Sequence, residues 1–548
     1  MPALFGRIHP LGVGVFVVAL TLALPVLVVL GFVFVPAGEV WQHLAATVLT
    51  DYIKNSLLLM LGVAIGTLLI GVTAAWLTSM CQFPGRGIFE WALLLPLAVP
   101  AYIIAYTYTG MLDFAGPVQS TLRAWFGWGF GDYWFPEIRS LEGAAIMLTL
   151  VLYPYVYLLT RAAFLSQSIC VLDVSRTLGN GPWRTFWFVA LPLARPAIIA
   201  GLSLALMETL ADFGTVQYFG VATFTTGIFR TWFGLGSAEA AAQLAALLMV
   251  FVFALIVLER YSRRSARYHH TSRRHQDIRR YQLRGWQAVL AFGFCFGVLL
   301  MGFLLPGAQL LSWTVTVADE VVDARFMQMV WNSLKLAAIA SVLALGLAIL
   351  LAYGQRLYPT RPVRFMVRMA GMGYAVPGAV IAIGVIIPFA WLDNTIDSWA
   401  RESFDYSTGL ILSGTLVALV FAYLTRFLAV SLQTVEAGLG KVTNSMEEAG
   451  RSFGYGPMTI LRRIHVPILK GSLLTALLLV FVDVLKELPA TLILRPFNYN
   501  TLAVRAYELA SDERLAEAAP SALAIVAVGI IPVILLSWTI TRSRKVAE

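Results

Sequence analysis

Four acidic residues lie inside apolar segments of this sequence, where carboxylates are rare. Glu208 and Asp212 are four residues apart, and so are Asp483 and Glu487. Residues four apart share one face of a helix, so each pair lines one side of its segment. Carboxylate oxygens are hard donors of the kind that hard cations prefer. The four residues are therefore candidates for lining a cation pathway.

The depth of these carboxylates supports a path and also allows a structural role. Counted from Arg195 at about 1.5 Å per residue, Glu208 lies roughly 20 Å in, near the middle of a bilayer. A carboxylate there costs about 2.5–3.5 kcal/mol and usually faces a water-filled path or a partner. In the structural alternative, Lys486 neutralises Asp483, and Glu208 and Asp212 bond backbone groups of broken helices. We assign no metal site to either pair.

The segments that must position the carboxylates are membrane spans. The chain has 548 residues, of which 59% are hydrophobic and 13% charged, whereas soluble domains are about 25% charged. This composition predicts an all-α integral membrane protein, and each span needs about 20 apolar residues. We expect twelve spans, at residues 11–35, 55–79, 88–112, 143–165, 195–219, 238–259, 286–312, 332–354, 366–391, 409–430, 469–494 and 519–541.

Basic residues indicate how these spans are oriented. Lys and Arg gather in alternate loops when the N-terminus is placed inside, which is typical of cytoplasmic loops. We therefore expect both termini in the cytoplasm and a retained first span rather than a removed signal peptide. The most basic stretch, 259–285, is interpreted as a cytoplasmic linker that meets anionic headgroups. The net charge of +9 then reflects topology, and we expect no nucleic-acid partner.

The linker separates two halves of similar sequence. Asn55-Ser56-Leu57 opens the second expected span, and Asn332-Ser333-Leu334 opens the eighth. Because each half has six spans, both halves have the same orientation, and we expect parallel repeats about an axis along the membrane normal. The expected domains are a first half at 1–258, the linker at 259–285 and a second half at 286–548.

One phrase appears in both halves, in a polar gap between spans. It reads GNGPWRTFWFVALP from Gly179 and GYGPMTILRRIHVP from Gly454, 275 residues later. Glycine permits the turn that ends a helix, and proline restricts the chain to a helix start or an exit. The pattern predicts a helix, a glycine break and a second helix that the proline stops. Such a rigid, protruding helical loop is suited to docking in a pocket on a partner protein.

The phrase with its upstream residues resembles the EAA loop of ABC-importer permeases. The second copy starts at Glu448-Ala449-Gly450, with glycine replacing the usual second alanine, and the first copy starts less typically at Asp173-Val174-Ser175. The resemblance implies the type I importer permease fold, with loops 173–192 and 448–467 docking on ATPase subunits. It implies coupling roles for Asp173, Gly179, Leu191, Pro192, Glu448, Ala449, Gly454, Ile464 and Pro467.

The same resemblance implies partners. A nucleotide-binding P-loop needs G-x-x-x-x-G-K-[ST], and Gly440-Lys441 continues with valine and lacks the first glycine. We therefore expect no cofactor on this chain, ATP and Mg²⁺ on two copies of a separate ATPase, and a periplasmic or surface substrate-binding protein. ATP-driven closure of the ATPases would move the two loops and alternate access across a bacterial inner membrane.

The cargo is inferred from the second half. The run DVLKELPATLILRPFNYNTLAVRAYELA, beginning at Asp483, and the fused halves are similar to ferric-iron importer permeases. This similarity implies Fe(III) as cargo. Importers for thiamine, polyamine or phosphonate are the alternatives, followed by a secondary transporter with parallel repeats. A membrane enzyme is a further alternative, but the sequence contains neither H-E-x-x-H nor G-x-S-x-G.

Overall fold

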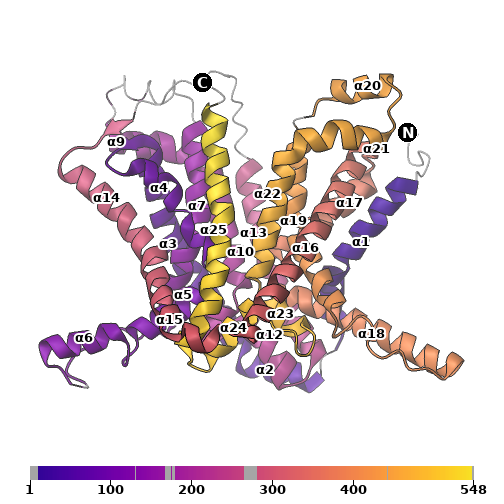
Figure 1. Cartoon of the computed structure of the whole chain (residues 1–548), viewed down its shortest axis with the longest axis horizontal. Coiled ribbons are helices and arrows are strands. Elements are labelled where there is room, and N and C mark those ends of the chain that lie inside the picture. The colour runs from indigo at the N-terminus through magenta and orange to yellow at the C-terminus, as the bar shows by residue number, and fades with distance from the viewer. Residues whose placement is uncertain are drawn as a thin grey trace. The chain divides into compact units, whose positions relative to one another are not determined.

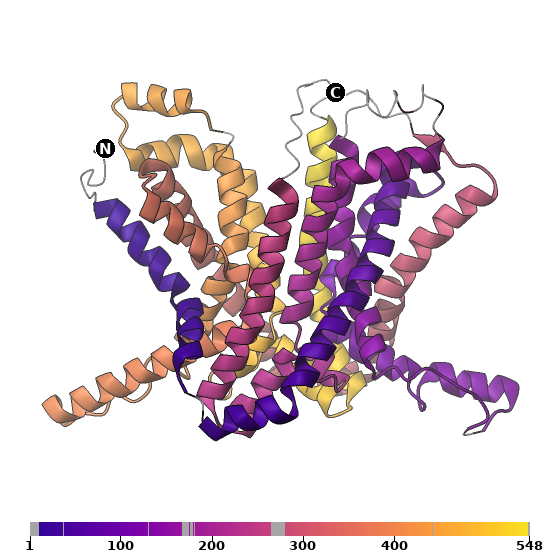
Figure 2. The same cartoon turned by 180° about the vertical axis from the view of Figure 1, so that it is seen from behind.

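The structure is a computed structural model that describes residues 10–36, 38–129, 131–166, 175, 179, 181–264, 280–440 and 442–545. Figures 1 and 2 show its elements, nearly all helices, from opposite sides. Within the described residues, eleven helices are long and apolar enough to cross a membrane, and the number is twelve if the bent pair Arg86–Ala98 and Ala101–Phe126 counts as one span. The expected all-helical membrane fold is confirmed.

Helices from both sequence halves combine in each of two compact units. The amino-half unit comprises Gln42–Gly227, Leu247–Val322 and Arg505–Glu548. Its main elements are α3 (Leu49–Met80), α4 (Arg86–Ala92), η2 (Leu95–Ala98), α5 (Ala101–Leu112), α6 (Pro117–Phe126), α7 (Leu141–Ser166), α9 (Pro182–Thr185), η3 (Phe186–Ala190), α10 (Leu191–Ala211), α11 (Gly214–Tyr218), α14 (Trp286–Leu299), η5 (Leu300–Leu304), α15 (Leu305–Val321) and α25 (Leu515–Lys545).

The carboxyl-half unit comprises Met1–Trp41, Ile228–Ala246 and Asp323–Val504. Its main elements are α1 (Pro10–Gly31), η1 (Phe32–Phe34), α16 (Ala324–Leu357), α17 (Arg361–Ala370), η6 (Gly373–Ala375), α18 (Gly378–Phe404), α19 (Leu416–Leu439), α20 (Asn444–Ser452), α21 (Pro457–Ile460), η7 (Leu461–His465), α22 (Val466–Leu485) and α23 (Pro489–Leu494).

The remaining elements lie at or across the limits of the units. A short parallel strand pair, in which Cys81 is opposite Tyr281, lies within the amino-half unit. The full set of remaining elements is α2 (Gly38–Thr47), β1 (Cys81–Gln82), α12 (Phe224–Phe229), η4 (Arg230–Gly234), α13 (Ala238–Arg264), β2 (Tyr281–Gln282) and α24 (Leu502–Ser511).

The compact units differ from the sequence halves 1–258 and 286–548. The opening helix α1 packs on α16, α17 and α18, whereas α15 and α25 pack on each other and on α5. The first contact is close, because a Cβ on Gly354 would lie 3.4 Å from Val15 Cβ. Small residues allow such close approach between membrane helices. Each unit therefore takes its centre from one half and covering helices from the other.

Two expected spans are interrupted at the same sequence phrase. Ala98-Val99-Pro100 separates η2 from α5, and Ala375-Val376-Pro377 separates η6 from α18. Proline lacks the amide hydrogen that would continue a helix, and it holds the preceding residue extended. Uninterrupted helices over 88–112 and 366–391 were therefore wrong predictions, and the repeated Ala-Val-Pro was the signal for the break.

Two other expected spans end early. The helix expected over 195–219 ends at Ala211, and the one expected over 469–494 ends at Leu485. A short helix follows each end, α11 and α23 respectively, and their first residues are 275 apart. The break places an acidic side chain between two helices in each half.

Candidate functional site

The loop at 448–467, for which the sequence analysis expects a coupling role and which we call the second coupling loop, has the helix and glycine turn that the sequence predicts. Glu448 and Ala449 are exposed on α20, which lies beyond the amino-terminal end of α22 in its unit (Figure 1). Gly454 follows α20 in the left-handed conformation, with φ of 77°. Ile464 lies beside Gly450, where a Cβ would come 2.8 Å from Ile464 Cδ1.

The first loop has the same turn where the structure describes it. Gly179 is exposed with φ of 80°, and a Cβ on Gly179 or Gly454 would meet nothing within 4 Å. Backbone conformation, rather than crowding, therefore favours glycine at both positions. Asp173 lies outside the described residues. Ser175 Oγ lies 3.1 Å from Thr185 Oγ1, so the described part of this loop is tied to α9.

The prolines of the two loops do not stop a helix, which corrects the sequence interpretation. Pro192 and Pro467 are the second residues of α10 and α22, with Leu191 as the first residue of α10. A π-helical turn directly precedes each helix, at Phe186–Ala190 and at Leu461–His465. Proline is tolerated in a first helical turn. Because the wider π-helical turn precedes each proline, the helix continues from the loop into the membrane span.

Asp212 is a capping residue in the amino-half unit. Its carboxylate accepts hydrogen bonds from Thr215 N at 3.1 Å, Val216 N at 3.1 Å and Thr215 Oγ1 at 3.0 Å. These donors belong to the first turn of α11, whose amides lack helical partners. Glu208, one turn earlier, is half-buried, and no partner for its carboxylate occurs among the described residues.

Glu487 caps α23 in the same way but also pairs with a buried arginine. It accepts from Ala490 N at 2.9 Å, Thr491 N at 3.0 Å and Thr491 Oγ1 at 2.7 Å. Arg426 Nη1 lies 2.9 Å from Glu487 Oε1, and both residues are buried. Asp483 lies 2.9 Å from Lys486 Nζ. Three of the four candidate carboxylates therefore have structural partners, and their role in a path stays a prediction.

Gly378 makes room for this ion pair. A Cβ there would lie 2.6 Å from Glu487 Oε1 and would also overlap Arg426 Nη1. The corresponding position in the first Ala-Val-Pro phrase is Ala101. The acidic cap there, Asp212, has no arginine partner among the described residues. The residue after Ala-Val-Pro is thus glycine (Gly378) in the half where Arg426 approaches the acidic cap, and alanine (Ala101) in the half where no described arginine does.

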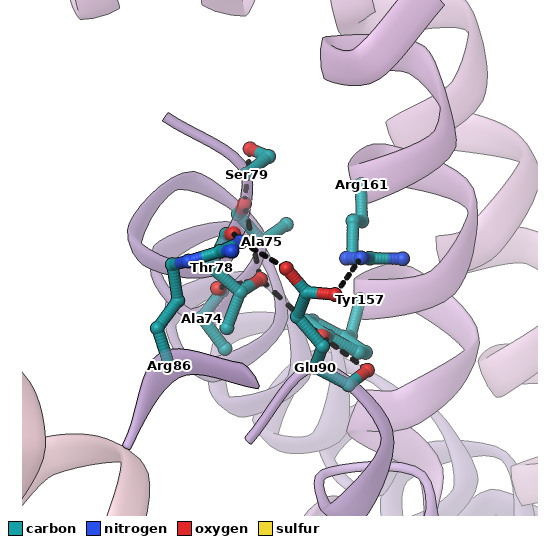
Figure 3. Close-up of polar contacts among 8 residues, drawn as sticks. All are labelled: Ala74, Ala75, Thr78, Ser79, Arg86, Glu90, Tyr157 and Arg161. Atoms are coloured by element: carbon teal, nitrogen blue, oxygen red, sulfur yellow. Dashed lines mark hydrogen bonds and ion pairs between the residues drawn. The ribbon is translucent and has the colours of Figure 1, made fainter. Parts of the chain in front are cut away.

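The buried arginine of the first half has a different partner. Arg161 Nη2 lies 3.0 Å from Glu90 Oε2, and Arg86 contacts the same carboxylate (Figure 3). Tyr157 donates to Glu90 O at 2.9 Å. Arg161 and Arg426 both follow Leu-Thr in the sequence, yet one pairs with α4 and the other with the segment before α23. Both arginines belong to the basic residues that the sequence analysis places in cytoplasmic loops, and neither ion pair is predicted there.

Another missed residue lies directly before the second coupling motif. Glu447 is buried, whereas Glu448 is exposed. Glu447 Oε1 lies 2.7 Å from Arg356 Nε. Adjacent positions on a helix point in different directions, so the Glu-Glu pair could have indicated one inward and one outward carboxylate.

Comparisons with known proteins agree with the fold. The model of the family "Binding-protein-dependent transport system inner membrane component" matches residues 344–545. The Fe(3+)-transport system permease protein FbpB 2 of Haemophilus influenzae is 27% identical, covering 95% of this chain and 96% of the relative. The Ferric transport system permease protein FbpB of Actinobacillus pleuropneumoniae is 23% identical over 85% of this chain and 67% of the relative.

A further relative is similar over one region only. The Molybdenum transport system permease protein ModB of Escherichia coli is 31% identical over 176 residues, which are 31% of this chain and 74% of the relative. The family match covers the carboxyl-terminal part of α16 and the elements from α17 to α25, including the loop at 448–467 and the Arg426–Glu487 pair. The helical spans, the paired glycine turns and these similarities together show that the chain belongs to the family of binding-protein-dependent transport system inner membrane components.

Proposed function

We propose that this chain is the permease of an ATP-driven importer for Fe(III), which a substrate-binding protein delivers from outside the inner membrane. The observation that carries the coupling role is the repeated exposed turn, with left-handed Gly179 and Gly454 275 residues apart. Two equivalent protruding loops provide one docking site for each of two copies of an ATPase subunit. ATP and Mg²⁺ belong to that partner, and the chain itself makes no bond chemistry.

The iron assignment is supported by the ferric-permease relatives that cover most of the chain. The carboxylates do not form a tight cation site, because Asp212, Asp483 and Glu487 have partners. Selectivity is then a property of the binding protein, and weak contacts along the path allow fast release. Glu208 is the carboxylate that we assign to this path, since it is half-buried with no described partner.

A second candidate cargo is an oxyanion, which the partial similarity to a molybdenum permease favours. Both cargoes require the same coupling loops. Uptake of labelled Fe(III) and of labelled molybdate by cells lacking this chain, with and without complementation, distinguishes them. Restored iron uptake supports our assignment, whereas restored molybdate uptake alone overturns it and leaves the coupling proposal intact.

The coupling role is tested with matched glycines. Gly179→Val with Gly454→Val forces a branched side chain into the left-handed region, which costs about 1–2 kcal/mol per residue or more. We expect at least a tenfold loss of ATP-dependent uptake at equal amounts of inserted chain.

The control is Gly181→Val with Gly456→Val, two residues further along each loop. Gly181 has φ of −70° and Gly456 has φ of −72°, and valine adopts this extended conformation before a proline. We expect uptake within twofold of the parent chain. Equal uptake by both double variants would contradict the coupling role of the turns.

A further inference from the structure

A buried group of ionisable residues lies beneath the second coupling loop. Glu447 Oε1 lies 2.7 Å from Arg356 Nε and 3.1 Å from His465 Nε2. Glu447 and His465 are buried, and they come from α20 and from the π-helical turn η7. We call Arg356, Glu447 and His465 the ionic anchor. It joins the two sides of the Gly454 turn.

Arg356 connects this anchor to the spans. Its Nη1 donates to Leu439 O at 2.7 Å, and its Nη2 donates to Val442 O at 2.7 Å. One guanidinium at the end of α16 therefore holds the end of α19, the link that follows it and, through Glu447, helix α20. A rigid fork with several donors suits such a junction.

A second contact from α16 supports the same loop. Tyr353, one turn before Arg356, donates from its hydroxyl to Pro457 O at 2.8 Å. Its ring lies edge-on to His465, with centroids 5.1 Å apart. The helical segments before and after Gly454 are thus both held by residues near the carboxyl-terminal end of α16. A displacement of α20 requires these polar contacts to break or α16 to move with it.

The first half has no equivalent charges. At the offset of 277 that aligns Asn55-Ser56-Leu57 with Asn332-Ser333-Leu334, Arg356 corresponds to Ser79. At the offset of 275 that aligns the two loops, Glu447 corresponds to Leu172 and His465 to Ala190. Ser79 and Ala190 are buried, while Leu172 lies outside the described residues. The Ser79 hydroxyl is uncharged and donates to Ala75 O, at 2.5 Å, within its own helix.

Aromatic packing occupies the corresponding place in the first half. The ring of Trp76 lies edge-on to Phe186 of the π-helical turn, at 5.0 Å between centroids, and to Phe164 at 5.6 Å. In the second half Trp76 matches Tyr353, at the offset of 277, and Phe186 matches Leu461, at the offset of 275. Both halves therefore place a ring against the π-helical turn, and among the described residues the ion pair of Arg356 with Glu447 is found beneath the second loop only.

We propose that the two coupling loops are held by different forces, the second by the ionic anchor and the first by aromatic packing around Trp76. This proposal rests on the coupling role argued above. Arg356 is then a positioning residue that acts through Glu447 on the orientation of α20. Loss of one anchor disturbs the contact of its own loop with the ATPase and spares the other loop.

The experiment uses photocrosslinking from equivalent exposed positions. Trp183 and Met458 each follow the first proline of their loop, and both are exposed. The full chain, co-expressed with its ATPase subunit in membrane vesicles, carries p-benzoylphenylalanine at position 183 or at position 458. The yield of crosslinked ATPase per inserted chain reports how each loop engages its partner.

Reciprocal variants test the two anchors. We expect Glu447→Gln to lower the yield from position 458 at least fivefold and to leave that from position 183 within twofold. Trp76→Leu should do the reverse. Arg356→Lys retains the charge but loses the forked hydrogen bonds, and we expect a two- to threefold loss at position 458 only. This variant keeps the test valid if Glu447→Gln inserts poorly.

The outcomes separate this proposal from the proposed function. Equal losses at both positions, or an unchanged yield at position 458 in Glu447→Gln and in Arg356→Lys, would overturn the separate anchors. Absence of crosslinks from both positions of the parent chain would instead overturn the coupling role of the loops. Ser79→Ala is the matched control, because it alters the position equivalent to Arg356 without removing a charge or a ring.

Discussion

At the scale of single residues, the two halves use the same acidic caps with different charge partners. Asp212 and Glu487 each cap a short helix, but Glu487 alone has a buried arginine 2.9 Å away. A buried ion pair stabilises only if its charges are well compensated. Glu487 also accepts three further hydrogen bonds, two from backbone amides and one from the Thr491 hydroxyl, which meets this condition.

The close approach at Gly378 leads to a prediction about stability. In Gly378→Ala, the added methyl group would displace Arg426 from Glu487, because the Cβ would lie 2.6 Å from Glu487 Oε1. Separation of a buried pair costs about 3–5 kcal/mol when one partner is lost, and we expect about 2–3 kcal/mol for a displaced pair. Thermal unfolding of the purified chain in detergent should show a clearly lowered midpoint.

Gly346→Ala is the control for this change. Gly346 lies within α16 of the same unit, and a Cβ there would meet nothing within 4 Å. Alanine is favoured over glycine in a helix by about 1 kcal/mol, so the midpoint should stay or rise. A midpoint for Gly378→Ala equal to that of Gly346→Ala would show that the ion pair does not need the glycine.

At the scale of elements, prolines and aspartates decide how helices continue after a break. A π-helical turn precedes Pro192, Pro306 and Pro467, each at the second position of the following helix. Further along, Asp393 on α18 is buried and accepts hydrogen bonds from Ile411 N, Leu412 N and Ser413 N at 2.7–3.2 Å. The part of α18 around Asp393 is thus hydrogen-bonded to residues 411–413, in the segment that leads into α19.

This fastening predicts a local effect. In Asp393→Ala, three backbone amides and the Ser413 hydroxyl lose their acceptor, and each unsatisfied buried group costs about 1–3 kcal/mol. We expect proteolysis within residues 405–415 to accelerate at least tenfold in detergent. Asn394→Ala, at an exposed neighbouring position, should leave the cleavage rate unchanged. Equal rates for the two variants would mean that Asp393 does not hold the segment.

At the scale of the whole molecule, the compact units combine helices from both sequence halves. Helix α1 packs on α16, α17 and α18, and α15 packs on α25 and α5. Folding of either unit therefore needs residues from both sides of the basic linker. Fusion into one chain keeps these segments at a high effective concentration.

A disulfide experiment checks this arrangement. In Val15→Cys with Gly354→Cys the two Cβ atoms lie 3.4 Å apart, which is near the range for a disulfide. After oxidation and cleavage at a protease site introduced in the linker, the two halves should migrate together without reductant and separately with it.

The matched control is Gly62→Cys with Ala145→Cys, whose Cβ atoms lie 3.1 Å apart within the first half. Its disulfide cannot connect the cleaved halves, so they should separate under all conditions. Separation of the halves in the Val15 and Gly354 variant despite complete loss of free thiols would contradict the packing of α1 on α16.

The amino-acid sequence by itself determined the class of protein, the number of spans and the repeated loops. These depend on local properties: apolar length, the distribution of basic residues, and the glycine and proline spacing around Gly179 and Gly454. The Ala-Val-Pro breaks were also readable in the sequence, because proline interrupts a helix wherever it occurs in its interior.

Only the tertiary structure decided which charges are partners and which helices share a unit. Arg161 and Arg426 have the same local sequence, yet Glu90 lies beside one and Glu487 beside the other. The Glu447-Glu448 pair could have indicated one inward and one outward carboxylate, but only the structure shows that Glu447 is the inward one and that Arg356 is its partner. Such pairings depend on side chains far apart in the chain, and a buried charge is stabilised by whichever partner the packing of helices brings within a few ångströms.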